Sequence, residues 1–453
     1  MFQRIYLHNS MVKIRSSISV VGLGKLGAVI AVSIASRGYR VIGVDVVKKH
    51  VDAINSGVSH LDEPGYAGLL KKYKQNITAT VDTRKAIEKS DITFIVVPTP
   101  SHKNGLFANS YVLQAVKNIG RALRKKTSFH VVAVVSTVTP GSSNKYILPA
   151  LEKTSHKRCG IDFGYCYNPT FVALGNVIHN YLSPDLVLIG ESDIKSGDIL
   201  EEFYQNIVIN RPHIKRMNPI NVEITKLALN TYITTKISYA NMLTQLCDVL
   251  PGADVAVVTG ALGHDSRIGH KYLLGGLPYG GPCFPRDNKA LTAVGKKHHI
   301  RLPLAQATDR INRSHLHFVV KKIEQHLTPS ATVGIIGLTY KEGTSVLDEA
   351  PGLKIAQALI KKNYNVKAFD LSSTKQIGHS TIGKKIQLCQ TVEELLRQVD
   401  VIIVTTRTKE YVSQITQGLI KNVKKITIID SWRILPIEKL PKSTTVIYLG
   451  KSS

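Results

Sequence analysis

The sequence contains few cysteines, few acidic residues and no long apolar run. Five cysteines are spread over 453 residues, an odd number without the spacing of a metal site. This scarcity argues against a disulfide framework or a metal centre and predicts a reduced, cytoplasmic compartment. Apolar runs stay short of the about 20 residues that cross a bilayer, and the N-terminus lacks the pattern of a signal peptide. We therefore expect no membrane partner.

Acidic side chains are too few to balance the basic ones, and the net charge is +27. Such a charge first suggests nucleic acid as a partner. The lysines are nevertheless spread along the whole chain, without a basic tail, a zinc finger or interleaved aromatic residues. We expect no nucleic-acid partner, and instead a basic surface that suits anionic ligands.

Apolar strands alternate with helical stretches at both ends of the chain. The first run, 17–21, enters a glycine turn, and a helix follows that ends at Gly38. Further apolar runs follow in the order "RVIGVD", "ITFIVVPTP", "HVVAVVSTV" and "LVLIG". A second series opens at "SATVGIIGLTY" and continues through "VDVIIVTT" and "KKITIID". Because nearly all-apolar strands alternate with helices, each series predicts a parallel sheet covered on both faces.

The region between the two series predicts one long helix. Residues 218–250 carry apolar side chains at roughly helical spacing and contain neither glycine nor proline after Pro219. We expect a helix of that length to bridge two domains, with room to pack against a second subunit. The predicted fold class is α/β, with two Rossmann-like doubly wound domains joined by a long central helix. The expected domains are 1–212, 213–325 and 326–453.

The stretch "GLGKLG" places glycines between a strand and a helix. Gly22 permits a tight turn, Gly24 lets a pyrophosphate approach the backbone, and Gly27 lets helix and strand pack closely. The N-terminus of the following helix then faces the phosphates. We expect a dinucleotide to bind at Gly22, Gly24, Leu26 and Gly27. The alternative is a glycine-rich turn in an unrelated α/β protein.

Asp45 ends the second strand, 21 residues after the second glycine of that turn. A carboxylate at this position accepts hydrogen bonds from ribose hydroxyls and disfavours a 2′-phosphate. The expected cofactor is therefore NAD rather than NADP, although Lys48 and Lys49 weaken that preference. Thr99 and Thr137 follow later strands, whose carboxyl ends line the ligand crevice of a doubly wound sheet. They are candidate cofactor contacts, or ordinary threonines that open loops.

Lys226 and Asn230 lie four residues apart on the long helix, so that both point to one side. Lysines on helix surfaces are usually solvated, and Glu223 and Lys236 attract equal interest from the pattern alone. The pattern therefore leaves a catalytic pair and a solvated helix face as alternatives.

Cys283 stands in "YGGPCFPRDNKAL", behind Gly280 and Gly281. Pro285 suits the first turn of a helix, which places the thiol just before a helix N-terminus. The helix dipole and a nearby lysine are expected to lower the thiol pKa and to favour the nucleophilic thiolate. Asp287 lies close enough to share the site. The alternative is a buried structural cysteine.

Taken together, these stretches resemble the UDP-glucose/GDP-mannose dehydrogenase family from about residue 18 to about residue 435. The matching stretches are "DVVKKHVDAINSG", "EPG", "VPTP", "STVTPG", "YNPTF", "EITKLALNTYITTKISYAN", "DSRIG", "YGGPCFPRD", "GLTYKEGT" and "DSWR". Their combination is far more specific than any one of them.

The resemblance implies that the C6 alcohol of a nucleotide sugar is oxidised to an acid in two NAD-dependent steps. Cys283 matches a nucleophile that captures the aldehyde as a thiohemiacetal, and the second oxidation leaves a thioester for water to hydrolyse. Lys226 matches a lysine that stabilises the oxyanion, with Asn230 as its hydrogen-bonding companion. Asp287 matches the acid that assists proton transfer and water activation. Thr137 completes the implied catalytic set.

The resemblance also implies how the substrate is held. Arg267 matches an arginine that reaches the substrate of a neighbouring subunit, and Lys341 and Arg433 match residues that hold the nucleotide sugar. The long helix is implied to form a homodimer. The implied substrate residues are Phe171, Lys226, Asn230, Arg267, Tyr272, Gly280, Lys341 and Arg433.

UDP-glucose is the substrate that the resemblance favours, because "YGGPCFPRD" looks like that branch of the family. Branches that oxidise N-acetylhexosamine derivatives often carry histidine where this chain has Pro282. The alternatives are a UDP-N-acetylhexosamine 6-dehydrogenase and a catalytically impaired paralogue that binds a nucleotide sugar.

Several positions depart from the family pattern. Thr170 and Leu174 stand where two carboxylates are usual, and the first of these is normally associated with the reacting water. Leu186 and Asp348 each replace an arginine, and Pro278 replaces a glycine. These substitutions bear on the final hydrolysis and on the cofactor fit, and they motivate the impaired-paralogue alternative. Thr170 is still able to place a water.

Overall fold

The computed structural model describes residues 17–328, 330–372, 385–421 and 425–452. Its contacts divide the chain into two compact units. The first comprises Met1–Thr99 and Asn109–Glu223, and the second comprises Pro100–Ala108 and Ile224–Ser453. The division after Glu223 falls inside one continuous helix, α9 (Pro219–Val249), which confirms the long helix that the sequence predicts. The three-part domain division stays a prediction.

The first unit contains a sheet with the strand order β3-β2-β1-β4-β5-β6-β7-β8 among the described residues. The order reverses between β1 and β4, which is the switch point of a doubly wound sheet. The strands are β1 (Ile18–Val21), β2 (Val41–Val44), β3 (Ile77–Thr80), β4 (Ile92–Ile95), β5 (Val131–Val134), β6 (Gly164–Tyr167), β7 (Leu186–Glu191) and β8 (His213–Met217).

One strand pair departs from the parallel sheet that the sequence predicts. β6 and β7 pair antiparallel, with Tyr167 opposite Gly190, whereas β7 and β8 are parallel. Parallel neighbours need a crossover that returns to the starting edge of the sheet. The 168–185 connection does not return, because β7 runs back from the edge at which β6 ends. Thr170 and Phe171 therefore follow the carboxyl end of β6 directly.

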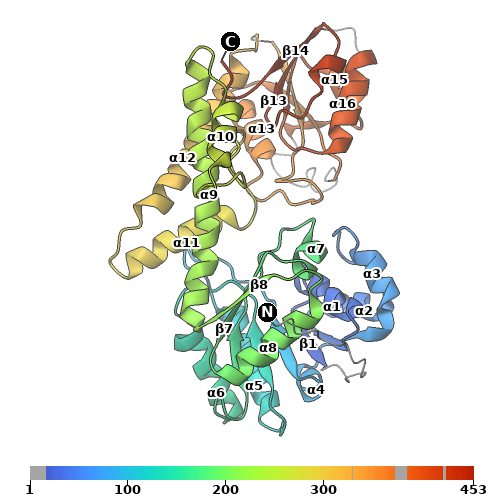
Figure 1. Cartoon of the computed structure of the whole chain (residues 1–453). Helices are drawn as coiled ribbons and strands as arrows, with labels where there is room; N and C mark the ends of the chain where they lie inside the picture. Colours follow the sequence, from blue (N-terminus) through green and yellow to red (C-terminus); the bar gives the residue numbers. More distant parts are fainter. Residues whose placement is uncertain (1–16, 329, 373–384, 422–424, 453) are drawn as a thin grey trace, which may run out of the picture. The chain divides into compact units, whose positions relative to one another are not determined.

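Alternate side chains of the strands enter two separate cores, one on each face of the sheet. Ile18 and Val20 belong to the core formed with α1, α3, α7 and α8, whereas Val21 belongs to the core formed with α4, α5 and α6 (Figure 1). The helices are α1 (Gly27–Ser36), α2 (Lys48–Ser56), α3 (Tyr66–Lys72), α4 (Thr83–Glu88), α5 (Ser110–Leu123), α6 (Leu148–Ser155), α7 (Val177–Leu182) and α8 (Ile194–Ile207). This covering of both faces confirms the doubly wound layering.

The second unit repeats the same strand order. Its sheet runs β11-β10-β9-β12-β13-β14 among the described residues, and all neighbouring strands in that order pair parallel. Its strands are β9 (Thr332–Ile336), β10 (Asn365–Phe369), β11 (Gln387–Leu388), β12 (Val401–Val404), β13 (Ile426–Asp430) and β14 (Thr444–Ile447). Its helices besides α9 are α10 (Val255–His264), α11 (Phe284–Lys297), α12 (Pro303–Glu324), α13 (Pro351–Lys361), α15 (Val392–Gln398) and α16 (Lys409–Lys421).

The turn after the first strand of each sheet uses the same two-glycine contact. Gly22 and Gly337 adopt φ values of 99° and 97°, which L side chains rarely adopt. A Cβ on Gly27 would collide with the carbonyl oxygen of Gly22, and a Cβ on Gly352 would collide with that of Gly337. Two Rossmann-like domains are thus confirmed by local geometry as well as by strand order. Within the described ranges, no helix combines the length and apolar character needed to span a bilayer.

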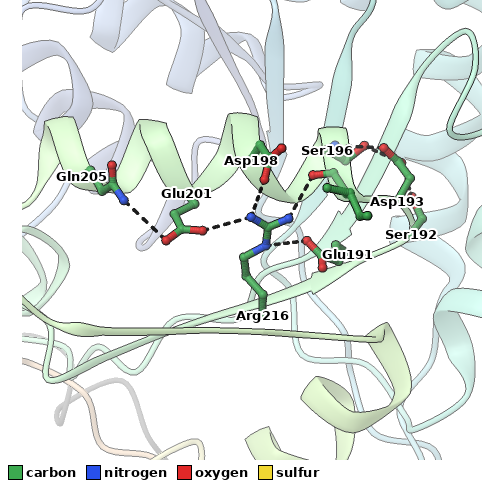
Figure 2. A network of polar contacts seen from close by, with 9 residues as sticks. Glu191, Ser192, Asp193, Ser196, Asp198, Glu201, Gln205 and Arg216 are labelled. Atoms are coloured by element: carbon green, nitrogen blue, oxygen red, sulfur yellow. Dashed lines mark hydrogen bonds and ion pairs between the residues drawn. The ribbon is translucent and has the colours of Figure 1, made fainter.

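A charged network fastens β8, the last strand in the order of the first sheet. The guanidinium of Arg216 donates from Nε to Glu191 at 2.7 Å and from Nη1 to Asp198 and Glu201 at 2.5 and 3.1 Å (Figure 2). Its Nη2 donates to the carbonyl oxygen of Ile194 at 3.0 Å. Glu191 ends β7, while Asp198 and Glu201 lie on α8. One cation therefore pairs with three carboxylates and ties the strand to a helix.

Replacing Arg216 by methionine is expected to destabilise this edge by about 1–3 kcal/mol, because three neighbouring carboxylates lose their shared partner. Hydrogen–deuterium exchange of the β8 amides measures the effect, and faster exchange is expected. Lys215→Met changes an exposed lysine of the same strand and serves as the control. Its effect is expected to stay within about 0.5 kcal/mol. Equal protection in the two variants would contradict the role of the network.

Candidate active site

The turn between β1 and α1 has the shape that a bound pyrophosphate requires. Gly22 and Gly27 are held against neighbouring backbone, so that neither position accepts a side chain. A Cβ on Gly24, by contrast, would meet no described atom within 4 Å. Leu26 is the N-cap residue of α1, whose first amides lie next to this open position. The predicted set Gly22, Gly24, Leu26 and Gly27 therefore fits a dinucleotide phosphate.

Asp45 holds this turn from the end of β2. Its Oδ2 accepts a hydrogen bond from the amide of Leu23 at 2.6 Å, and its Oδ1 accepts one from the amide of Val47 at 2.8 Å. Each carboxylate oxygen has two lone pairs, so ribose hydroxyls can still donate to this group. The carboxylate is thus oriented before any cofactor binds, and the residues present fit NAD.

The loops after β4 and β5 are tied together by one side chain. Ser136 joins the two loops, because its hydroxyl donates to the carbonyl of Val97 at 2.7 Å and accepts from the Val97 amide at 2.9 Å. Thr99, two residues after Val97, is buried, and Thr137, which follows Ser136, is half-buried. Thr99 follows β4, which borders the switch point, and Thr137 follows β5, the next strand in the sheet.

Glu223 supports the same loop and is a residue whose role the sequence pattern misses. It is fully buried near the start of α9, just after its first turn. Its carboxylate accepts from the amides of Gly141 and Ser143 at 2.5 and 2.8 Å and from the Ser143 hydroxyl at 2.7 Å. Burial raises the pKa of Glu223, and these hydrogen bonds oppose the shift only in part. The signal in the sequence is its place one helical turn before Lys226.

The second unit brings together four predicted catalytic residues from α9 and α11. Asn230 donates from Nδ2 to Oδ2 of Asp287 at 2.6 Å, and both side chains are buried. Cys283 is the N-cap residue of α11, with Pro285 in the first turn, as the sequence predicts. Lys226 is buried and interacts electrostatically with both Cys283 and Asp287. A thiol, an ammonium and a carboxylate thus share one site.

The electrostatics of this site correct one prediction from the sequence. Desolvation raises the pKa of the Cys283 thiol, and the carboxylate of Asp287 raises it further. Arg286 and Lys226 act in the opposite direction without reversing the shift. The predicted lowering of the thiol pKa is therefore wrong, because desolvation and a neighbouring carboxylate outweigh two cations. Desolvation also lowers the pKa of Lys226, against the influence of Asp287 and Cys283.

The glycines ahead of Cys283 pack against the long turn between β9 and α13. The amide of Gly281 donates to the carbonyl of Asp348 at 3.1 Å. A Cβ on Gly280 would collide with the carbonyl of Glu349, and one on Gly281 would press on the ring of Tyr340. Gly280, predicted as a substrate contact, is thus also required for this close packing.

A segment from the N-terminal half of the sequence supports the catalytic helices. Residues 100–108 belong to the second unit, where Phe107 packs with Leu227 and Ala290. The guanidinium of Arg286 lies over the Phe107 ring at 4.8 Å. Phe107 thus contacts Leu227, which follows Lys226 on α9, and Arg286, which precedes Asp287 on α11.

Two predicted substrate residues lie near α9. Arg267 pairs with Asp265 at 2.6 Å, and its side chain is 86% exposed. Lys236 on α9 donates to the carbonyls of Ile268 and Gly269 at 2.9 and 3.2 Å, which anchors this loop to the helix. Tyr272 is exposed in the same loop and has a φ of 64°.

The other predicted substrate residues of the second unit lie close to its sheet. Lys341 is in the turn after β9, where its carbonyl accepts from the Thr339 hydroxyl at 3.2 Å. Arg433 follows β13, pairs with Asp254 at 2.7 Å and lies over the Tyr448 ring at 4.9 Å. The structure therefore does not bring Arg433 to the cysteine by any described contact; it ties Arg433 to the start of α10.

Two departures from the family pattern meet in the first unit. Thr170 and Leu186 line one small cavity of about 20 Å³, together with Phe171, Tyr181 and Tyr204. A cavity of that size holds about one water. Leu174 packs against the core of the first unit instead of presenting a charge. Among the described residues, no cluster of histidine, cysteine or carboxylate side chains suits a metal ion.

Comparison with known proteins identifies three successive regions. Residues 16–208 match the NAD binding domain of the UDP-glucose/GDP-mannose dehydrogenase family, residues 221–314 its central domain, and residues 334–437 its UDP binding domain. Together these matches cover more than half of the chain.

Individual relatives agree with this result. A GDP-mannose 6-dehydrogenase of Pseudomonas aeruginosa is 36% identical over 78% of this chain and 80% of its own length. A UDP-glucose 6-dehydrogenase of Bacillus subtilis is 31% identical over 93% of this chain and 90% of its own. The solved UDP-glucose dehydrogenase of Pyrobaculum islandicum is 28% identical, with a TM-score of 0.85 over 98% of this chain and 99% of that one. The chain therefore belongs to the UDP-glucose/GDP-mannose dehydrogenase family and is an NAD-dependent nucleotide-sugar 6-dehydrogenase.

Proposed function

We propose that the protein oxidises the C6 alcohol of a nucleotide-linked hexose to the uronic acid, in two steps that pass through Cys283. The observation that carries this proposal is the buried cluster of Lys226, Asn230 and Asp287 beside Cys283. Each oxidation releases a hydride, which NAD accepts when it is bound. The sum is one alcohol, one water and two NAD giving one carboxylate, two NADH and three protons.

Lys226 and Asn230 stabilise the oxygen of the reacting carbon. The pKa of Lys226 is lowered mainly by desolvation, so its amine takes up a proton less readily than a solvated lysine. Positive charge at this position is favoured when negative charge develops on the alcohol oxygen. The hydrogen bond from Asn230 to Asp287 fixes the carboxylate that assists proton transfer.

Cys283 attacks the aldehyde and forms a carbon–sulfur bond, giving a thiohemiacetal. The second oxidation converts this adduct into a thioester, and water then displaces the thiolate to release the acid. Asp287 is the carboxylate proposed to activate that water. Thr170, which stands where the family usually has a carboxylate, stays a candidate for placing a water. Thr137 stays part of the proposed catalytic set.

UDP-glucose is the first proposed substrate, since the cysteine loop resembles that branch of the family. GDP-mannose is the second, because a relative at 36% identity is a GDP-mannose 6-dehydrogenase. UDP-N-acetylhexosamines are the third candidate class of substrate. The competing hypothesis is an impaired paralogue that binds a nucleotide sugar without turnover. A cytoplasmic location is part of the proposal and is supported by five free cysteines.

Incubation with NAD and each of these nucleotide sugars tests the function. We expect UDP-glucose or GDP-mannose to yield about two NADH per sugar, because the oxidation removes four electrons. No NADH from any sugar would contradict the proposal. One NADH per sugar would show that the route stops at the aldehyde or at a persistent thioester.

The variant Cys283→Ala separates the two oxidations. We expect it to lose acid formation, because no thiol remains to hold the aldehyde, and to yield at most about one NADH per sugar. Cys159→Ala removes a half-buried thiol from the other unit and is the matched control. Unchanged acid formation in Cys283→Ala would rule out the covalent route.

The pH dependence of the Cys283 thiol provides a second test. Its raised pKa means that alkylation by iodoacetamide, which requires the thiolate, should increase with pH beyond the midpoint of free cysteine. Asp287→Asn removes a nearby negative charge and should move the midpoint to lower pH. Lys226→Met removes a positive charge and should move it to higher pH. Peptide mass spectrometry reports alkylation at Cys283, and a shift of either variant in the opposite direction would contradict this account.

A homodimer is also part of the proposal, with α9 as the contact. Tyr232, Tyr239 and Leu246 recur every seven residues, and Met242 and Val249 lie three residues after the second and the third of them. All five are exposed, with Tyr232 at 64% and Val249 at 70%. This 3-4 spacing is typical of a seam between two helices. The loop carrying Arg267 is anchored to the same helix, which suits its predicted contact with a neighbouring subunit.

The double variant Tyr239→Glu with Leu246→Glu is expected to be monomeric, because two charges would be buried in the apolar seam. Sedimentation equilibrium measures the mass of the assembly. Ile161→Glu with Ile209→Glu changes two exposed isoleucines of the first unit and should leave a dimer. A monomeric unmodified protein at micromolar concentration would contradict the proposal.

A further inference from the structure

Two stacked histidines lie beside the carboxylate that faces the cofactor ribose. His50 is in the first turn of α2, and His60 lies in the loop that leads to α3. Their rings are 4.9 Å apart with an interplanar angle of 27°. Nδ1 of His50 lies 3.3 Å from Oδ2 of Asp45. Neither histidine belongs to the cofactor contacts expected from the sequence.

The two rings have different roles. Nε2 of His60 is 3.0 Å from the carbonyl oxygen of Leu23, in the glycine turn. Because a carbonyl oxygen only accepts, Nε2 carries the proton and the ring braces the turn. Burial lowers the pKa of His60, and the hydrogen bond to Leu23 and the charge of Asp45 oppose that shift only in part. His60 therefore supports the turn through Nε2.

In both rings Nδ1 is buried and has no hydrogen-bond partner among the described residues, so the difference lies in the surroundings of the Nδ1 of His50. It is at ion-pair distance from Asp45 but lacks the geometry of a hydrogen bond. The two oxygens of Asp45 already bind the amides of Leu23 and Val47. Protonation of His50 therefore changes the net charge at the carboxylate without moving it.

We propose that His50 is a specificity-determining residue that sets the choice between NAD and NADP through its own protonation. With a neutral imidazole, the charge of Asp45 is uncompensated and repels a ribose 2′-phosphate. With an imidazolium, that charge is neutralised, and the exposed Lys48 and Lys49 make the rim positive. The inference goes beyond the use of NAD and does not depend on which sugar is oxidised.

The groups that face the histidine pair come from several elements. Asp45 lies at the end of β2, Lys48 and Lys49 lie on α2, and Tyr66 of α3 meets the edge of the His60 ring. Burial raises the pKa of Tyr66, which stays neutral over the relevant range. Imidazole is the side chain whose ordinary titration falls between about pH 5 and 8. Burial shifts the pKa of His60 downward, and His50 is therefore the imidazole to which we assign the change of charge.

Titration calorimetry of the full chain with NAD and with NADP, from pH 5.5 to 8.5, tests the proposal. The ratio of the NADP to the NAD dissociation constant is expected to fall at least about tenfold on acidification, as for one charge at ion-pair range. The 2′-phosphate itself titrates near pH 6 and contributes to the slope in every variant. His50→Gln, which is always neutral, should show that contribution alone. His50→Lys, which is always charged, should keep a low ratio at every pH. Its slope should likewise contain only the contribution of the 2′-phosphate.

An identical pH slope in the unmodified protein and in His50→Gln would overturn the proposal. So would a slope that survives in His50→Gln and disappears in His60→Gln, since the titrating group would then be His60. Loss of NAD affinity in both His50 variants would also overturn it, because a purely structural role would explain that result.

Discussion

The hydrogen bond from Asn230 to the buried carboxylate of Asp287 is the contact on which the catalytic cluster depends. It joins α9 to α11 through two residues that lie 57 positions apart in the sequence. Lys226 lies one turn from Asn230 on the first helix, and Cys283 caps the second. Arg286 of the same helix lies 3.4 Å from the other oxygen of this buried carboxylate, and Asn230 is its partner from the neighbouring helix. The same arrangement places an ammonium near a thiol.

The electrostatic balance of that cluster differs from the usual picture of a reactive cysteine at a helix N-terminus. Desolvation and Asp287 raise the pKa of Cys283 more than Arg286 and Lys226 lower it. The direction of that balance favours the protonated thiol, although Cys283 itself is exposed. Attack on the aldehyde then needs a proton acceptor, a role that the fixed carboxylate of Asp287 suits.

The two Rossmann-like domains share one construction and use it differently. In each, a glycine in a left-handed turn contacts a glycine at the start of a helix, and an aspartate after the second strand binds the turn amides. Asp45 faces an open turn that fits a pyrophosphate. Asp370 holds a turn that continues through Asp348 and Glu349, where it packs on the glycines ahead of Cys283. The two domains thus differ in the length of this turn. The short turn after β1 fits a cofactor phosphate, whereas the long turn after β9 supports the catalytic loop.

The sequence by itself determined the fold class, the long helix, the glycine turn with Asp45 and the placement of Cys283 before a helix. Those features depend on residues close in sequence, whose glycines, prolines and apolar spacing restrict the backbone directly. The antiparallel β6–β7 pair, the burial of Glu223 under the 139–143 loop and the packing of Phe107 on α9 and α11 were decided only by the tertiary structure. So was the direction of the Cys283 pKa shift. Each of these depends on which distant groups meet and on how much water they exclude, and neither quantity is encoded in local spacing.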